Sequence, residues 1–148
     1  MKHKMYILCG LPGSGKSTWL EYRTFSNEIV LCPDEFRKTI TGQDYYAPLD
    51  EIVWFCVKNA ARVLIKQVDL IIDATSLSKG SRSQWIRIAQ EAGVQVWCYY
   101  FDTPLELCKE RIEKRERVVP DEVMERMVNQ FEYPTLDEGF EEILNIGP

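Results

Sequence analysis

The chain has 148 residues, of which 45% are hydrophobic and 28% are charged, and its formal net charge is −5. This length predicts a single domain, 1–148, that can bury a core without a metal or disulfide staple. The negative net charge argues against a broad surface that binds along nucleic acid. It is compatible with a site for a small anionic ligand or for one end of a polynucleotide strand.

The cysteine and histidine content indicates the cellular compartment and excludes some kinds of active site. The five cysteines include no CxxC pair, which predicts buried free thiols in a reducing compartment. The single histidine, His3, lies near the terminus and argues against a His-based triad or zinc site. The first apolar run is too short for an export signal and no run approaches 18 apolar residues, so we expect a cytoplasmic protein without a membrane span.

Strand-like and helix-like patterns alternate along the whole chain. We expect strands at 5–9, 29–32, 70–72, 94–101 and 140–146, the last at a sheet edge. We expect helices at 18–25, 35–40, 50–67, 82–92, 104–116 and 120–131. This alternation predicts an α/β fold with a mostly parallel, five-stranded sheet and helices on both faces.

Some of these elements carry finer signals. The run at 94–101 is almost continuously apolar, as expected for a strand buried on both faces. The last two helices each begin at a proline, Pro104 and Pro120, in the favoured first turn. Gly42 and Gly93 are placed to end the helices that precede them.

The segment Gly10-Leu-Pro-Gly-Ser-Gly-Lys16-Ser17 fits the pattern G-x-x-x-x-G-K-[ST] between a strand and a helix. Glycines let the backbone wrap a phosphate with several N–H groups, and the following helix adds its positive N-terminal end. Lys16 supplies a cation for the β- and γ-phosphates of a nucleoside triphosphate, and Ser17 offers a hydroxyl to Mg²⁺. The predicted nucleotide-binding residues are Gly10, Gly13, Ser14, Gly15, Lys16, Ser17 and Thr18.

Two further segments end strands in acidic or polar side chains. Leu70-Ile-Ile-Asp73 places a carboxylate at the carboxyl end of a strand, where it can lie near Mg²⁺, in contact through a water molecule, or near the acceptor. Thr75 follows at the same edge. In Cys32-Pro33-Asp34, the proline keeps Cys32 extended and favours a helix start, so Asp34 and Arg37 share a helix face beside the phosphate site. Such a pair can equally be a surface salt bridge.

A basic island, Arg111-Ile-Glu-Lys-Arg-Glu-Arg117, lies within the acidic second half of the chain. Arg111 and Arg115 are four residues apart, so we expect them on one helix face. Arginines brought down by a closing segment can stabilise a transferring phosphoryl group. We therefore expect a lid at about 109–120, with Arg111, Arg115 and Arg117 as its candidate residues.

The order GLPGSGKST, PDEFR, IIDATS and R-x-x-x-R-x-R before Val-Pro resembles the polynucleotide 5′-hydroxyl kinases and their P-loop kinase relatives, and the resemblance runs on through FEYPTLDEGFEEI. It implies a P-loop kinase fold with a helical lid. By this resemblance Asp34 takes the proton from the attacking hydroxyl and Arg37 grips the acceptor. Asp73 helps to order the acceptor side, and Arg115 matches the catalytic lid arginine.

Two positions depart from that pattern: Cys32 stands where the family often has serine, and Ser76 where relatives often have asparagine. Both border the acceptor side. The sequence thus favours an Mg²⁺-dependent kinase that moves the γ-phosphate of ATP, or another nucleoside triphosphate, to a hydroxyl, most simply a polynucleotide 5′-OH. One alternative is a small-molecule kinase acting on a sugar, nucleotide, antibiotic or cell-wall precursor. Another is a nucleotide-gated switch that hydrolyses its nucleotide without an acceptor.

Overall fold

The structure is a computed structural model that describes residues 2–23, 28–44, 46–115 and 119–148. Within these ranges the strands are β1 (Lys4–Cys9), β2 (Glu28–Leu31), β3 (Asp69–Ile72), β4 (Gln95–Phe101) and β5 (Glu142–Ile146). The helices are α1 (Lys16–Tyr22), α2 (Pro33–Thr41), α3 (Asp50–Leu64), α4 (Lys79–Ala92), α5 (Leu105–Glu113) and α6 (Asp121–Gln130), with 3-10 turns η1 (Ala47–Leu49) and η2 (Leu136–Glu138).

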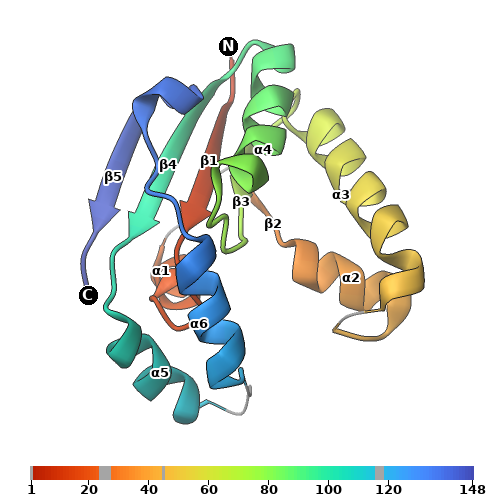
Figure 1. The fold of residues 1–148 in the computed structure, drawn as a ribbon. Helices are drawn as coiled ribbons and strands as arrows, with labels where there is room; N and C mark the ends of the chain where they lie inside the picture. The colour runs from red at the N-terminus through yellow and green to blue at the C-terminus, as the bar shows by residue number, and fades with distance from the viewer. Residues whose placement is uncertain (1, 24–27, 45, 116–118) are drawn as a thin grey trace.

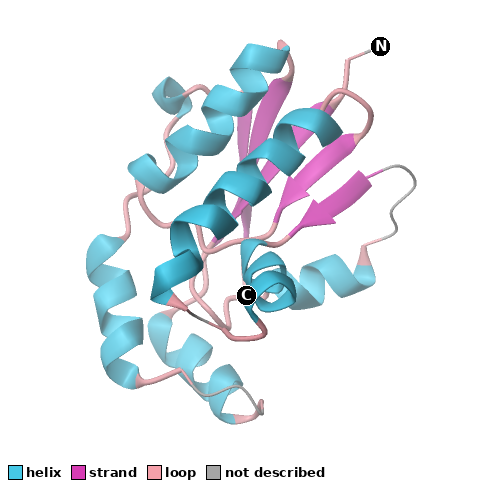
Figure 2. Cartoon of the chain, turned by 90° about the vertical axis from the view of Figure 1, so that its right-hand side faces the viewer, coloured by secondary structure: helices cyan, strands magenta, loops and turns pink. Residues whose placement is uncertain are grey.

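The strands form one sheet in the order β2-β3-β1-β4-β5, and every pairing in it is parallel. The predicted five-stranded sheet is confirmed, and β5 lies at the expected edge. Because parallel strands share a direction, all their carboxyl ends meet at one edge of the sheet. In Figure 1 the arrowheads point toward the end of the molecule where α1, α5 and α6 lie, and Figure 2 shows helices and loops gathered below the strand ends.

The two faces of the sheet are covered unequally. On one face α3 and α4 pack their apolar stripes, among them Val57, Ala61, Trp85 and Ala89, against buried strand residues such as Ile72. On the other face the cluster around Leu8, Ile71 and Phe101 is covered by Trp19 and Leu20 of α1. Helices therefore lie on both faces, as predicted, but the α3–α4 side holds most of the core.

This asymmetry corrects the expectation for β4. Val96 and Cys98 are buried, whereas Trp97 and Tyr99 are only partly buried. The strand therefore alternates between a core face and a half-covered face, although its sequence is almost continuously apolar. The half-covered side chains are aromatic, and Trp19 packs on the ring of Tyr99 at 4.9 Å between centroids.

The helices end at the predicted glycines, but the two prolines lie one position earlier than predicted. Gly42 and Gly93 end α2 and α4 with φ of 74° and 68°, in the left-handed conformation that glycine favours. Pro104 and Pro120 precede the first helical residue of α5 and α6 instead of occupying it, and their carbonyls accept the first helical hydrogen bonds. All five cysteines are free; Cys9, Cys98 and Cys108 are buried, while Cys32 and Cys56 are partly exposed.

Candidate active site

A pocket of about 420 Å³ lies at the carboxyl edge of the sheet, and we call it the P-loop pocket. Segments distant in the sequence meet around it: the glycine-rich loop, the start of α2, the end of β3 and the α5–α6 region. Its lining comprises Pro12, Gly13, Gly15, Lys16, Ser17, Cys32, Pro33, Asp34, Glu35, Trp54, Asp73, Ala74, Thr75, Ile112, Arg115, Val119 and Met127. Most of the sequence-predicted site residues are therefore neighbours in space.

The glycine-rich loop is closely packed at Gly13. Its φ of +80° lies in the left-handed region, and a Cβ there would stand 2.5 Å from the Cys108 carbonyl oxygen of α5. Only glycine lets the loop turn and approach α5 so closely. Thr103 adds a second tie, because its hydroxyl donates to the Ser14 carbonyl at 2.8 Å. The loop is thus held against the helix that follows β4.

Two side chains of the loop suit an incoming phosphate. Lys16 is buried, and its Nζ donates to the carbonyl oxygens of Gly10 at 2.6 Å and Leu11 at 2.9 Å, which folds the ammonium group back over the loop. The Ser14 hydroxyl oxygen is buried without a hydrogen-bond partner in the described part of the chain. A buried polar atom of this kind gains a partner when a phosphate oxygen enters the loop.

The residues present also fit a nucleotide-bound Mg²⁺. Ser17 and Asp73 both line the P-loop pocket. Across residues 2–23, 28–44, 46–115 and 119–148, no group of three or more His, Cys, Asp or Glu side chains could hold a metal by itself. Mg²⁺ keeps several waters and takes one or two protein ligands together with substrate phosphates, so a hydroxyl and a carboxylate suffice.

Asp34 and Arg37 form a short ion pair at the start of α2. Pro33 is the first residue of the helix, and Cys32 before it is extended at φ −113°, ψ 111°, as predicted. Arg37 donates from Nη1 to Asp34 Oδ1 at 2.7 Å and from Nε to Asp50 Oδ1 at 3.1 Å. The Arg37 side chain is only 10% exposed, whereas that of Asp34 is 63% exposed. A buried guanidinium therefore fixes a carboxylate that remains open to the pocket.

The guanidinium of Arg37 also lies 5.9 Å from the ring centroid of Trp54 on α3. Trp54 lines the P-loop pocket but was not predicted as a site residue, because its place there follows only from how α3 crosses the sheet. Cys32, on the same wall, has its pKa raised by burial, with Asp73 and Asp34 raising it further.

The loop after β3 is tied to the glycine-rich loop. The Asp73 N–H donates to the Leu31 carbonyl and the Gly10 N–H donates to the Thr75 carbonyl, both at 2.9 Å. Ser76 adopts φ +49°, a left-handed conformation in which asparagine is the more usual non-glycine residue. Its carbonyl accepts from the Cys9 thiol at 3.2 Å. Asp73 and Thr75 are therefore placed by bonds to the strands on either side.

Arg82 is the residue beneath this loop, and sequence inspection missed it. It is fully buried, and its Nη1 donates to the carbonyls of Ser76 at 2.9 Å and Leu77 at 3.0 Å. Its Nε and Nη2 bond both carboxylate oxygens of Glu138, at 2.8 and 3.2 Å. A signal existed, because Arg82 falls in the apolar stripe of α4 with Trp85, Ile86 and Ala89.

The predicted lid arginines take different positions. Arg111 lies on α5 and donates from Nη1 to the Gly13 carbonyl at 3.3 Å. Arg115 is exposed and lines the P-loop pocket, but α5 ends at Glu113, so the expectation that both arginines share a helix face is wrong. The turn closes when the Arg115 N–H bonds the Ile112 carbonyl three residues back. Arg117 lies outside the described residues.

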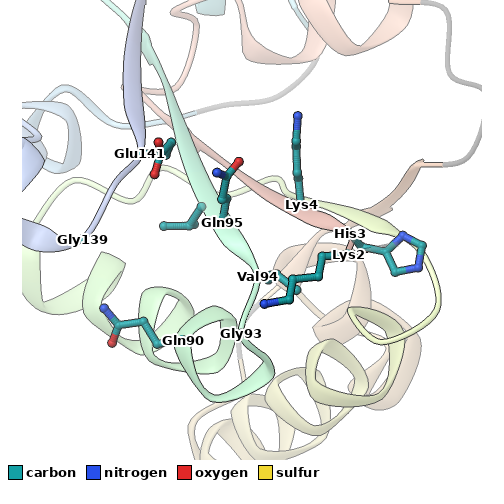
Figure 3. Close-up of a pocket in the computed structure, with 10 residues that line it drawn as sticks. Lys2, His3, Lys4, Gln90, Gly93, Val94, Gln95, Gly139 and Glu141 are labelled. Atoms are coloured by element: carbon teal, nitrogen blue, oxygen red, sulfur yellow. The ribbon is translucent and has the colours of Figure 1, made fainter.

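A second hollow of about 420 Å³ lies at the opposite, amino end of β1 and β4. In Figure 3 its labelled side chains, including Lys4, His3 and Gln90, point in different directions. Ligands of open parallel sheets bind at the carboxyl ends of the strands, so the P-loop pocket is the better candidate.

Across the described ranges, no helix combines the length and apolar character needed to cross a membrane.

Comparison with known proteins agrees with this geometry. The family AAA_33, described as an AAA domain, matches residues 5–134. The bifunctional polynucleotide phosphatase/kinase of Schizosaccharomyces pombe is 27% identical over 93% of this chain and 32% of the relative. The L-seryl-tRNA(Sec) kinase of Methanococcus maripaludis is 27% identical over 88% of this chain and 53% of the relative. A chain in the structure of the Pnkp1/Rnl/Hen1 RNA repair complex shares 32% identity at a TM-score of 0.75, covering 87% of this chain and 44% of that chain.

This chain spans between about a third and a half of the lengths of those relatives. The family match covers most of the chain, and it includes the glycine-rich loop, the start of α2 and the end of β3. The fold and the phosphate-binding loop agree with it. The chain belongs to the AAA_33 family and is a P-loop kinase domain of the polynucleotide-kinase-like type.

Proposed function

We propose that this kinase moves the γ-phosphate of ATP to a hydroxyl acceptor, and that the acceptor is the 5′-OH end of a polynucleotide. One observation supports this most strongly: Asp34, an exposed carboxylate fixed by a buried arginine, shares a pocket of about 420 Å³ with the phosphate-binding residues Lys16 and Ser17. A base and a phosphoryl donor placed in one pocket are what transfer to an alcohol requires.

In this proposal the acceptor oxygen attacks the γ-phosphorus in line, the bond from that phosphorus to the bridging oxygen of ADP breaks, and the hydroxyl proton passes to Asp34. Lys16 and the backbone N–H groups of the loop hold the β- and γ-phosphates. Ser17, with Asp73 through a water molecule, would hold Mg²⁺, which neutralises phosphate charge when bound. The remaining negative charge is met by lid arginines, of which Arg115 lines the pocket.

Three residues are proposed to hold the acceptor: Arg37, Asp73 and Thr75. A guanidinium carries five N–H donors, and the hydrogen bonds of Arg37 to Asp34 and Asp50 use two of them. Arg37 is buried behind Asp34 and does not itself line the P-loop pocket, so in this proposal its remaining N–H groups would meet the acceptor at the wall that Asp34 forms. Asp73 and Thr75 line the same pocket from the neighbouring strand end. The lid at about 109–120 stays part of this proposal.

A small-molecule kinase is the second candidate, and the net charge of −5 is the observation that favours it. A long polynucleotide is usually drawn to a basic surface, whereas the net charge of this chain is negative. A nucleotide-gated switch is the third. Acceptor-independent hydrolysis faster than any transfer would favour that third function.

The test is transfer from labelled ATP to a panel of 5′-hydroxyl oligonucleotides and small alcohols. Lys16→Ala should lose transfer to every acceptor, and Asp34→Asn should lower kcat by roughly 10²–10⁴-fold. Asp121→Asn is the matched control, because Asp121 follows a proline at the start of α6 as Asp34 does in α2. Near-normal transfer by Asp34→Asn at neutral pH would remove Asp34 from the mechanism.

The same panel separates the acceptor classes. An oligonucleotide kinase should bind its acceptor less tightly as salt is raised, because phosphate contacts release counterions. A small neutral alcohol should show little salt dependence. Efficient transfer to a small alcohol, with no transfer to any oligonucleotide, would decide for the second candidate.

A further inference from the structure

Another pocket, of about 480 Å³, lies beside the P-loop pocket, and we call it the tryptophan pocket. The two pockets share Trp54, Ala74, Thr75 and Met127 in their linings. The two pockets are therefore neighbours that share a wall at Thr75. Its volume lies within the roughly 300–1,000 Å³ of small-molecule sites.

The chemistry of the tryptophan pocket differs from that of the phosphate site. Among the described residues that line it, none is Lys, Arg, Asp or Glu. The walls carry the indoles of Trp54 and Trp85, whose centroids are 6.2 Å apart, together with the amides of Gln84 and Gln130. Such a lining suits an uncharged planar ring that stacks on an aromatic face and exchanges hydrogen bonds with amides at its edge.

Trp54 has a charged neighbour on one side of its ring. The Arg37 guanidinium lies near its ring at 5.9 Å, and the same guanidinium bonds the proposed base Asp34. One buried cation therefore joins the residue that would take the proton to the ring that would stack on the ligand. Ser76, also in the lining, has a buried hydroxyl without a partner within the described ranges.

We propose that the tryptophan pocket binds the heterocyclic base of the 5′-terminal nucleotide of the acceptor, with Trp54 as its stacking platform. The proposal rests on the proposed function, because it needs an acceptor whose reacting hydroxyl lies at Asp34 while its base lies across Thr75. In this proposal Trp54 contacts the base of the acceptor, while Arg37 and the lid arginines contact phosphate groups. An aliphatic alcohol would leave this pocket unfilled.

The test compares a 5′-hydroxyl trinucleotide with the same molecule carrying an abasic residue at its 5′ end. Loss of a stacked base should raise the acceptor KM about tenfold and leave the KM for ATP unchanged. Trp54→Leu should raise the KM of the intact acceptor similarly and should abolish the difference between the two acceptors, as coupled partners do in a double-mutant cycle. Trp54→Phe should keep much of that difference.

Trp97→Leu is the matched control, because it removes an indole from β4 on the other face of the sheet and should leave acceptor discrimination intact. The proposal is overturned if the abasic penalty is equally large in Trp54→Leu, or if the penalty appears only when the second nucleotide is abasic. A Trp54→Leu protein with a normal KM for ATP shows that the fold has survived.

A separate readout covers failure of the proposed function. If no oligonucleotide is phosphorylated, adenosine is titrated against protein whose P-loop is saturated with a non-hydrolysable ATP analogue. Quenching of tryptophan fluorescence in the unmodified protein that is largely lost in Trp54→Leu would support the base site alone. Absence of quenching in both would overturn it.

Discussion

Cys32 shows how a single residue can report on the charge of the site. Burial raises the pKa of its thiol, and the carboxylates of Asp73 and Asp34 raise the pKa further. A raised pKa keeps the thiol protonated over the neutral range, and only the thiolate reacts with alkylating agents. Cys32 should thus be a slow nucleophile even though it lines the P-loop pocket.

We predict that iodoacetamide modifies Cys32 more slowly than it modifies free cysteine at pH 8, with a midpoint above the ordinary thiol value of about 8.5. Asp34→Asn removes one of the charges that raise the pKa, so the Cys32 thiol should ionise at lower pH and react faster. Mass spectrometry of the modified peptide against pH measures both effects. Unchanged reactivity in Asp34→Asn would contradict the contribution of Asp34 to the raised pKa of Cys32.

Contact between two elements, the glycine-rich loop and α5, depends on Gly13. A methyl group there would meet the Cys108 carbonyl at 2.5 Å, in addition to the strain of its φ of +80°. Gly42 supplies the comparison, because its φ is +74° and nothing lies within 4 Å of its Cβ position. The two glycines share the backbone strain and differ in the clash.

We predict that Gly42→Ala lowers the free energy of unfolding by about 1–2 kcal/mol, the usual cost of a left-handed alanine. Gly13→Ala should lower it by roughly 1–3 kcal/mol more and should also weaken ATP binding, because α5 or the loop must move. Urea unfolding and ATP titration of both variants measure this. Equal losses in the two would show that the loop does not rest on α5.

At the scale of elements, the sequence predicts most of the framework because its signals are local. Alternation and the caps at Gly42 and Gly93 placed strands and helices within a few residues. The partial exposure of Trp97 could not be predicted, because it arises where α1 covers only part of that face of the sheet. The position of Arg115 was also missed, because the end of α5 at Glu113 carries no glycine or proline signal.

The candidate site also has features that the sequence predicts and features that depend on the tertiary fold. The phosphate loop and the pair of Asp34 with Arg37 could be predicted from motif and spacing. The burial of Arg37 against Trp54 could not, because it arises where α2 meets α3. Arg82 lies at a position whose periodicity marks it as buried, but its partner Glu138 comes from a segment 56 residues away.

At the scale of the whole molecule, Arg82 joins segments that the sheet alone does not hold together. It links the loop after β3, which carries Thr75, to η2 near the C-terminal strand. Glu138 also accepts the Thr135 N–H at 2.8 Å, so the pair fixes the approach to β5. Both side chains are almost wholly buried.

We predict that Arg82→Met lowers the free energy of unfolding by about 3–5 kcal/mol, since it leaves Glu138 buried and uncompensated. Arg87→Met, at an exposed position of the same helix, should change it by no more than about 0.5 kcal/mol. Adding Glu138→Leu to Arg82→Met should recover part of the loss. Denaturant unfolding gives all three values, and a loss as small as that of Arg87→Met would contradict the assignment.

The parallel order of the sheet also determines how much of the chain must be synthesised before the protein can bind a nucleotide. β1 is synthesised before the other four strands, yet Met5 pairs with Leu70 and Val96. Such distant pairings close long loops and slow folding. The phosphate loop follows β1 and rests on α5, so a nascent chain must emerge beyond about residue 113 before it can hold a nucleotide. Until β3 and β4 have emerged, the apolar strand β1 stays unpaired, and a chain stalled at that stage would be prone to aggregate.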